Sequence, residues 1–402
     1  MEKFGTESAV SPHAWGVVVV AVALMAIGLV TVASASTTLE RSFWTWPPWK
    51  APFGRQAIFS FAGLVVLMIA TRVSARFLAY RATWQGLAVG LLALSLAGLA
   101  LTLMGGLAGS RRGSQRWLRF PVGSFDFSIQ PSELAKIALI VFLAWWLGRS
   151  SAQPRKLLSG FLPAALVLGS LAALVGKWDF GTAALLALVG GLIMAVAGCR
   201  WIYLIPSALL GAGGLAASVI FVPYRWQRLV AHGDLWRDSQ GAGYQPLQSL
   251  TGIASGGWMG AGLGSGIQKY GYLPEAHTDF AFAILCEETG LVGAGLVVGL
   301  FCAMLWLGLR ITLAAQTASE RLLAFGVTVT LGLQAAMNIA VVTAVTPTKG
   351  ISLPLVSAGG SGTLTYCFAL GLLAGVAQRI GSGKSVAADP YAVGWRGERV
   401  QA

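Results

Sequence analysis

The sequence is poor in charged side chains, which make up only 11% of its 402 residues. A soluble globular domain carries about 25% charged residues. Here 56% of the residues are hydrophobic, and too few polar side chains remain to cover a core that buries them all. This composition excludes an ordinary soluble fold and predicts an integral membrane protein.

Histidine and cysteine are scarce as well. The chain has three histidines and four cysteines. The cysteines lie in or beside apolar segments, and no two of them form a Cys-x-x-Cys pair. Neither a zinc site nor a disulfide framework is therefore expected.

Long apolar runs, by contrast, recur throughout the chain. Runs of about 20 residues are each long enough to cross a bilayer as a helix. We predict an all-α integral membrane fold with about ten transmembrane helices and a large outer loop between the seventh and the eighth. The predicted spans are 14–35, 54–71, 84–104, 133–148, 159–176, 182–198, 201–222, 280–309, 321–345 and 361–379. They form one polytopic domain, residues 1–380, and a short disordered tail follows at 381–402.

Lys and Arg in the short connections predict the orientation, because cytoplasmic loops carry an excess of positive charge. The connections 72–81 and 149–156 each contain three such residues. Both termini and the tail are therefore expected in the cytoplasm. The long loops 105–132 and 223–279 are then expected outside.

The long outer loops are also rich in cations, among them Arg111, Arg112, Arg116, Arg228 and Lys269. Because positive charge resists placement outside, such a surface suggests an anionic partner, such as phospholipid headgroups or a lipid diphosphate. Interfacial anchoring by Arg and Trp is the alternative explanation. For Arg111 and Arg112 the sequence leaves both open.

Glu133 and Lys136 are charged residues at the start of the fourth predicted span. Their i, i+3 spacing puts them on one helix face, where they can pair. Ser132, after Gln130 and Pro131, is the expected N-cap. The pair either fixes helix packing or gives Lys136 a place in a polar cavity that binds phosphate.

Three more acidic residues fall at or inside predicted spans. Glu287 and Glu288 are adjacent, so about 100° of helix rotation separates them, and they are not expected to face one cavity. A packing role is the default for each. Asp179 is expected to cap the sixth span or to pair with Lys177.

The end of the second long loop contains the strongest candidate for chemistry. Glycines recur over residues 256–264 and allow the backbone to approach a ligand or another helix closely. Glu275, His277 and Asp279 follow within a few residues. A carboxylate at the boundary between water and membrane can have a raised pKa and act as a general base. The residues alone slightly favour a simpler role, in which Thr278 or Asp279 caps the next helix.

Several motifs resemble one known family along residues 14–380. They are Gly113-Ser-Gln-Arg-Trp117, Gln130-Pro-Ser-Glu-x-x-Lys136, Asp179-Phe-Gly-Thr-Ala183, Pro274-Glu-Ala-His-Thr-Asp-Phe280 and Pro347-Thr-Lys-Gly350 with the Ser- and Gly-rich segment after it. In this order they resemble the SEDS family, named for shape, elongation, division and sporulation. Pro-Thr-Lys-Gly and Gln268-Lys269 are most similar to its division branch, FtsW, rather than to the RodA or SpoVE branches.

The resemblance implies an inverting peptidoglycan glycosyltransferase that polymerises lipid II at the outer face of the cytoplasmic membrane. The catalytic base would be Asp279. It would deprotonate the acceptor hydroxyl that attacks the lipid-linked sugar, and undecaprenyl diphosphate would leave. The substrate-binding candidates are Lys269, Arg116, Lys136 and Lys349, in descending order for the diphosphate, together with Glu133, Glu275 and His277.

The resemblance also implies partners and a location. It implies a class B penicillin-binding protein that crosslinks the strands, other divisome membrane proteins, and a place in the inner membrane at the division septum. No nucleic acid partner is expected. A divalent cation, Mg²⁺ or Mn²⁺, could help to neutralise the diphosphate, although no metal-ligand set is readable in the sequence.

Two other functions remain open at this stage. A lipid II flippase would use the Glu133–Lys136 pair as part of a polar path for the headgroup. A non-catalytic divisome scaffold would only recruit the crosslinking partner. The expected position of Asp279 at the outer face, rather than midway through the membrane, favours external chemistry.

Overall fold

The computed structural model describes residues 11–36, 51–77, 81–104, 108–111, 114–122, 125–149 and 151–381. It is mainly α-helical, as predicted, and all ten predicted spans are helices. They are α1 (Pro12–Ala35), α2 (Pro52–Phe77), α3 (Arg81–Met104), α4 (Pro131–Gly148), α5 (Leu162–Gly176), α6 (Phe180–Val196), α7 (Trp201–Ile220), α10 (Ala281–Ala314), α11 (Ala318–Val342) and α12 (Gly360–Gly381). A short π-helical turn, Leu157–Phe161, precedes α5. The predicted tail lies outside the described residues.

Within the described residues, nine helices are long and apolar enough to cross a membrane. The remaining predicted span, α6, has 17 residues, at the short end of the range of about 17–25 that spans a bilayer. The protein is therefore a multi-pass membrane protein.

Local sequence explains where several helices begin. Ser11 caps α1, and Thr317 with Glu320 forms a capping box at the start of α11. Proline occupies the first turn of α4, where its missing N–H costs nothing. The residue before that proline, Gln130, is the N-cap. The prediction that Ser132 caps α4 is therefore wrong: Ser132 lies inside the helix and accepts a hydrogen bond from the Gln130 side chain, 2.9 Å long.

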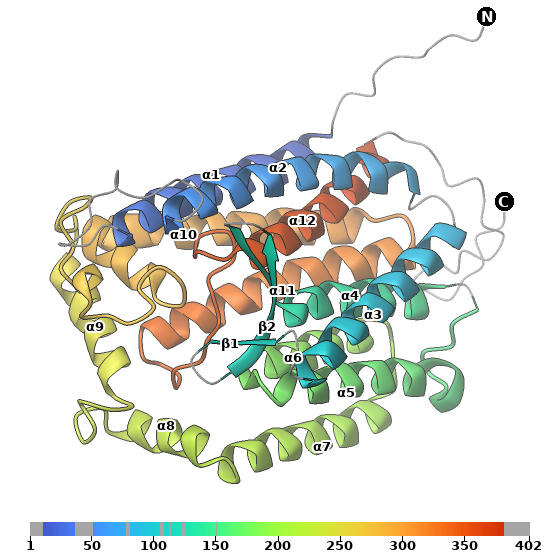
Figure 1. Cartoon of the computed structure of the whole chain (residues 1–402). Helices are drawn as coiled ribbons and strands as arrows, with labels where there is room; N and C mark the ends of the chain where they lie inside the picture. Colours follow the sequence, from blue (N-terminus) through green and yellow to red (C-terminus); the bar gives the residue numbers. More distant parts are fainter. Residues whose placement is uncertain are drawn as a thin grey trace, which may run out of the picture.

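The central helices of the bundle are α4, α11 and α12 (Figure 1). In α4, 78% of the most apolar 18-residue stretch is buried, whereas in α7 the buried share of the corresponding stretch is only 6%. Helix α12 packs along α2, and α11 packs between α4 and α10. The peripheral α7 lies at one edge of the molecule, where it leads into the second long loop.

Both long loops contain structure that the sequence did not predict. The first forms an antiparallel sheet of β1 (Ala108–Arg111), β2 (Ser114–Val122) and β3 (Phe125–Ile129), in that order, with Phe120 opposite Phe127. The second contains α8 (Pro223–Gly233), α9 (Tyr244–Gly256) and a 3-10 turn, Gln268–Tyr270.

The glycine-rich segment 256–264 packs against a break in α10 at Gly290. The φ angle of Gly290 is 65°, outside the helical range. A Cβ at this position would lie 2.4 Å from the backbone nitrogen of Gly260 and from the carbonyl oxygen of Trp258. The glycines here let a loop and a broken helix approach backbone to backbone.

Candidate active site

Asp279 lies in a turn between the second long loop and α10. The amides of Thr278 and Phe280 donate to the carbonyl of Glu275, whose φ of 57° is rare for a residue with a side chain. The Thr278 hydroxyl donates to the Glu275 carboxylate at 2.8 Å. Phe280 is the N-cap of α10 and has no side-chain cap bond. The expectation that Thr278 or Asp279 caps this helix is therefore wrong, and the Asp279 carboxylate is left for another role.

The carboxylate of Asp279 faces a small space beside Gly350. A Cβ built on Gly350 would lie 3.3 Å from Oδ2 of Asp279 and 3.2 Å from Nη1 of Arg116. Gly350 itself is exposed. The missing side chain therefore leaves a gap, tight even for a methyl group, between an acid and a cation from distant parts of the chain.

The pKa of Asp279 is raised from 3.8 to about 7, mainly because burial disfavours its charged form. The negative charges of Glu275 and Asp179 raise it further, while Arg116 and Arg228 oppose the shift. Near neutral pH this carboxylate can accept a proton and release it again, as a general base must.

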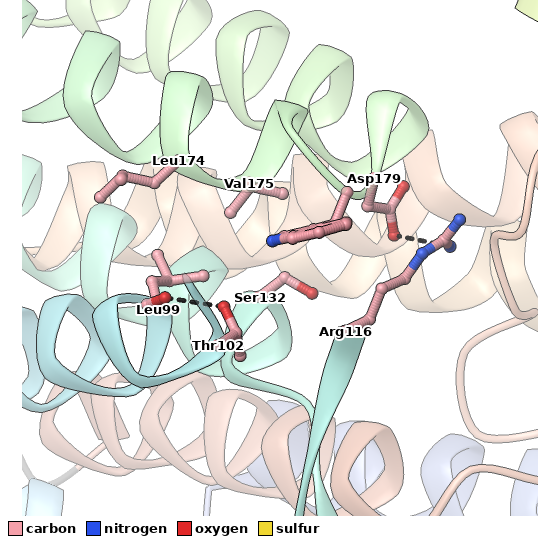
Figure 2. A pocket seen from close by; sticks show the side chains of 8 residues that line it. Leu99, Thr102, Arg116, Ser132, Leu174, Val175 and Asp179 are labelled. Carbon is pink, nitrogen blue, oxygen red and sulfur yellow. Dashed lines mark hydrogen bonds and ion pairs between the residues drawn. The ribbon is translucent and has the colours of Figure 1, made fainter. Parts of the chain in front are cut away.

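Arg116 reaches the site from β2, in the sheet of the first long loop. Its guanidinium lies 3.5 Å from Oδ2 of Asp179, and the two side chains point toward one another in Figure 2. Asp179 is the N-cap of α6, as predicted, and accepts hydrogen bonds from the backbone and the hydroxyl of Thr182. Its ionic partner in the structure is Arg116.

A narrow cavity no larger than about one water molecule adjoins this ion pair (Figure 2). Arg116 and Asp179 lie at one end of it, and apolar side chains of α3 and α5 line the other. The lining residues are Leu99, Thr102, Arg116, Ser132, Leu174, Val175, Trp178 and Asp179. The space beside the Arg116–Asp179 ion pair is therefore nearly filled by these side chains.

Two further cations, Lys349 and Arg228, lie near this site. The ammonium of Lys349 lies 5.7 Å from the centre of the Phe180 ring, at the start of α6. Arg228, from α8, donates to the carbonyl of Thr348 at 3.1 Å. Burial lowers the pKa of both groups. Together with Arg116 they form a cationic group near Asp279.

Lys269 lies apart from this cationic group. Its ammonium is buried and donates to Ser34, to the carbonyl of Gly264 and to Glu288, at 2.6–2.9 Å. An ammonium has three N–H donors, so all of them are used inside the protein.

Lys136 is likewise buried, within the helix bundle. It donates to Glu133, to Gln334 and to Tyr366 at 2.7–2.9 Å. The predicted Glu133–Lys136 pair is confirmed. Its ammonium also has no free donor, which matches the packing alternative.

Glu287 and Glu288 both hold the end of the second long loop. Glu287 accepts from the amides of Ile267 and Gln268, and Glu288 accepts from Lys269 and Ser34. The default packing role agrees with these bonds. The expectation that the two carboxylates face apart is wrong, because both accept hydrogen bonds from the same loop segment, residues 266–269.

Of the other sequence candidates, Glu275 and His277 stay close to Asp279. Glu275 contributes to its raised pKa. The backbone carbonyl of His277 accepts a bond of 2.8 Å from the amide of Ala358, which joins the turn to the 343–359 loop. Within the described residues, no group of three or more His, Cys, Asp or Glu side chains has a geometry that could hold a metal ion.

Sequence reasoning did not single out Arg228 or Asn338. Arg228 was one loop cation among many, and only the fold brings it to Thr348. Asn338, like Gln334 one turn before it, is an amide within an apolar span, a pattern that signals a buried hydrogen-bonding partner. That signal was available in the sequence.

Comparison with known proteins identifies the family. The family model of the cell cycle proteins FtsW, RodA and SpoVE matches residues 14–380. The chain belongs to this family. The predicted resemblance is thereby confirmed.

Curated relatives within the FtsW/RodA/SpoVE family agree. A probable peptidoglycan glycosyltransferase FtsW of Geobacter sulfurreducens is 36% identical over 370 residues, which cover 90% of this chain and 95% of that protein. One of Nitrosococcus halophilus is 39% identical over 358 residues, covering 88% of this chain and 89% of that protein. These names support the division branch.

Solved structures have the same fold. A chain from a peptidoglycan synthase complex that coordinates polymerization and crosslinking superposes with a TM-score of 0.69 at 27% identity, covering 90% of this chain and 97% of that one. The rod shape determining protein RodA of Thermus thermophilus gives 0.63 at 27% identity, with 90% and 96% covered.

Proposed function

We propose that this FtsW/RodA/SpoVE family protein is a peptidoglycan glycosyltransferase of cell division in which Asp279 is the general base. Family membership and the names of the relatives support the activity. One observation carries the role of Asp279: its carboxylate, with a pKa of about 7, lies across the narrow gap at Gly350 from Arg116. A base poised near the working pH combines the right protonation state with the ability to take a proton.

In this proposal the substrates are lipid II and a lipid-linked glycan chain. The carboxylate of Asp279 takes the proton of the acceptor 4-hydroxyl as that oxygen attacks C1 of the lipid-linked sugar. The bond from C1 to the diphosphate breaks, and undecaprenyl diphosphate leaves with the electron pair. Because attack and departure occur on opposite faces, the configuration at C1 inverts.

The leaving diphosphate develops negative charge, which cations must stabilise. Arg116 lies across the gap from Asp279, and Lys349 and Arg228 lie beside it. We assign these three to the diphosphate. Lys269 and Lys136 are not assigned to it, because their ammonium groups have no free donor. Glu275 then acts on the pKa of Asp279, and His277 holds the turn through its backbone.

The proposal includes a partner and a location. A solved relative belongs to a synthase complex that coordinates polymerization with crosslinking. A class B penicillin-binding protein is therefore the proposed partner, within an assembly of other divisome proteins. The proposed location is the inner membrane at the septum, with both termini in the cytoplasm.

A polymerisation assay tests the base. Purified protein with its partner transpeptidase is given lipid II, and glycan strands are resolved by gel electrophoresis. The wild type should make strands, and Asp279→Ala, folded to the same extent, should make none. Polymer from Asp279→Ala would contradict the base assignment.

The same variant separates the other functions. If the protein were only a scaffold, Asp279→Ala would rescue cells depleted of the wild type. If it were a flippase, it would move lipid II headgroups across vesicles and make no polymer. The proposal predicts neither outcome.

A further inference from the structure

Helix α11 carries two amide side chains one turn apart, Gln334 and Asn338. Both are almost fully buried, with exposed fractions of 1% and 0%. An amide in an apolar environment costs free energy unless it is hydrogen-bonded. The bonds made by these two side chains lead out of the helix bundle to the loops of the candidate site.

Asn338 joins the two loops that carry Asp279 and Gly350. Its Nδ2 donates to the carbonyl of Asp279 at 2.8 Å and to the carbonyl of Ile351 at 2.7 Å. Since both partners are carbonyl oxygens, only the NH₂ end of the amide can face them, and both of its hydrogens are used. Its Oδ1 has no hydrogen-bond partner among the described residues. The side chain therefore acts through these two bonds.

The two carbonyls are placed where a small movement matters. One belongs to the peptide of Asp279 itself. The other belongs to the residue after Gly350, the glycine that separates Asp279 from Arg116. A single rigid amide on a buried helix thus sets the distance between the carboxylate and the opposite wall of the gap.

Gln334 holds the same loop from one turn earlier. Its Nε2 donates to the carbonyl of Ser352 at 2.9 Å. Its Oε1 accepts hydrogen bonds from Lys136 and from Tyr366. The buried Glu133–Lys136 pair therefore anchors the amide that supports the loop next to Asn338.

We propose that Asn338 is a positioning residue that clamps the Asp279 turn to the Gly350 loop. This inference rests on the proposed role of Asp279. The clamp holds the carboxylate in the geometry required for proton transfer without touching substrate. Displacement of a reacting group by about 1 Å can cost on the order of 100-fold in rate.

Variants of Asn338 test the clamp. Asn338→Ala removes both bonds. Asn338→Asp keeps the shape, and even when protonated it can donate only one hydrogen bond. We expect kcat for lipid II polymerisation to fall by about 10–100-fold in Asn338→Ala and by less in Asn338→Asp, with KM changed by less than about threefold.

Thr330→Val is the matched control. Thr330 is buried on the same helix, but its hydroxyl donates only to the carbonyl of Gly326 in that helix, at 2.7 Å. Its kcat should stay within about twofold of the wild type, because no loop of the site depends on it.

Hydrogen–deuterium exchange supplies a readout that does not depend on activity. In Asn338→Ala, peptides covering 274–280 and 349–357 should exchange faster than in Thr330→Val. The exchange rate of peptides from α11 itself should be the same in both variants. Wild-type kcat, or unchanged exchange in both loops, would overturn the clamp. If Asn338→Ala does not fold, Asn338→Asp gives the same two readouts. Activity of Asp279→Ala would contradict the assignment of Asp279 as the general base. The exchange result would still show whether Asn338 holds the two loops together.

Discussion

At the scale of single residues, the proposed reaction depends on a carboxylate with an unusual pKa and on a glycine that leaves a narrow space beside it. Burial and two neighbouring carboxylates raise the pKa of Asp279 to about 7. Gly350 leaves a gap into which the carboxylate and the Arg116 guanidinium both point. In the proposed mechanism the acid is the proton acceptor, and the missing side chain of Gly350 leaves room for the reacting oxygen.

Gly350→Ala should therefore block the reaction without unfolding the protein. The added methyl group would fill the gap at 3.2–3.3 Å from both charged groups, while the φ of Gly350 is not positive, so alanine is not strained there. We expect kcat/KM for polymerisation to fall by about 10–100-fold, as for other displacements of reacting groups, with an unchanged Tm.

Gly359→Ala is the control for this substitution. A Cβ there meets no atom within 4 Å, and its φ is also not positive. Its activity should match the wild type. Equal activity of the two alanine variants would mean that substrate does not enter the gap beside Gly350.

At the scale of secondary structure, buried polar contacts hold the end of the second long loop against the helices. The Lys269–Glu288 pair joins the end of the second loop to α10, and Ser34 extends it to α1. Breaking a buried ion pair leaves an uncompensated charge and costs about 3–5 kcal/mol. These contacts hold the segment that leads to Asp279.

Lys269→Met should accordingly lower Tm and the yield of folded protein. If Lys269 instead bound diphosphate, the same variant would raise KM and leave Tm unchanged.

Lys349→Met is the contrasting variant, because Lys349 is only partly buried and its ammonium lies beside the proposed diphosphate position. For Lys349→Met we expect weaker substrate binding with little change in Tm, measured by thermal unfolding and steady-state kinetics.

Much of the helical fold was predictable from the sequence, because each span needs only an apolar run of sufficient length. The sheet that carries Arg116 was not predicted, since its strands lie within a loop rich in charge and glycine. Glu133–Lys136 was predictable from helix periodicity. The contacts of Arg228 with Thr348 and of Asn338 with Asp279 were not predictable. Each joins residues more than 50 positions apart in the sequence, and only tertiary packing brings them together.

At the scale of the whole molecule, the candidate site collects residues from β2, the start of α6, α8, the turn before α10 and the 343–359 loop. The interior helices α4 and α11 form its floor through Lys136, Gln334 and Asn338. Side chains fixed on buried helices thus support the polar loops that carry Asp279 and Gly350, as expected for a preorganised site.

The proposed topology predicts opposite labelling of two exposed positions. After replacement of the native cysteines, Gln240→Cys in the second long loop should react with a membrane-impermeant maleimide in intact spheroplasts. Gln316→Cys, between α10 and α11, should react only after the membrane is opened. Both positions are exposed. The reverse pattern would contradict the proposed orientation and the external location of Asp279.

The most direct test of the central claim is the pH dependence of polymerisation. A base must be deprotonated to act, and the pKa of Asp279 is raised to about 7. The initial rate of lipid II polymerisation by the wild type should therefore fall as the pH is lowered through about 7, and it should level off above that value. A rate that stays constant from about pH 5 to pH 8, with the protein folded throughout, would contradict the assignment of Asp279 as the base.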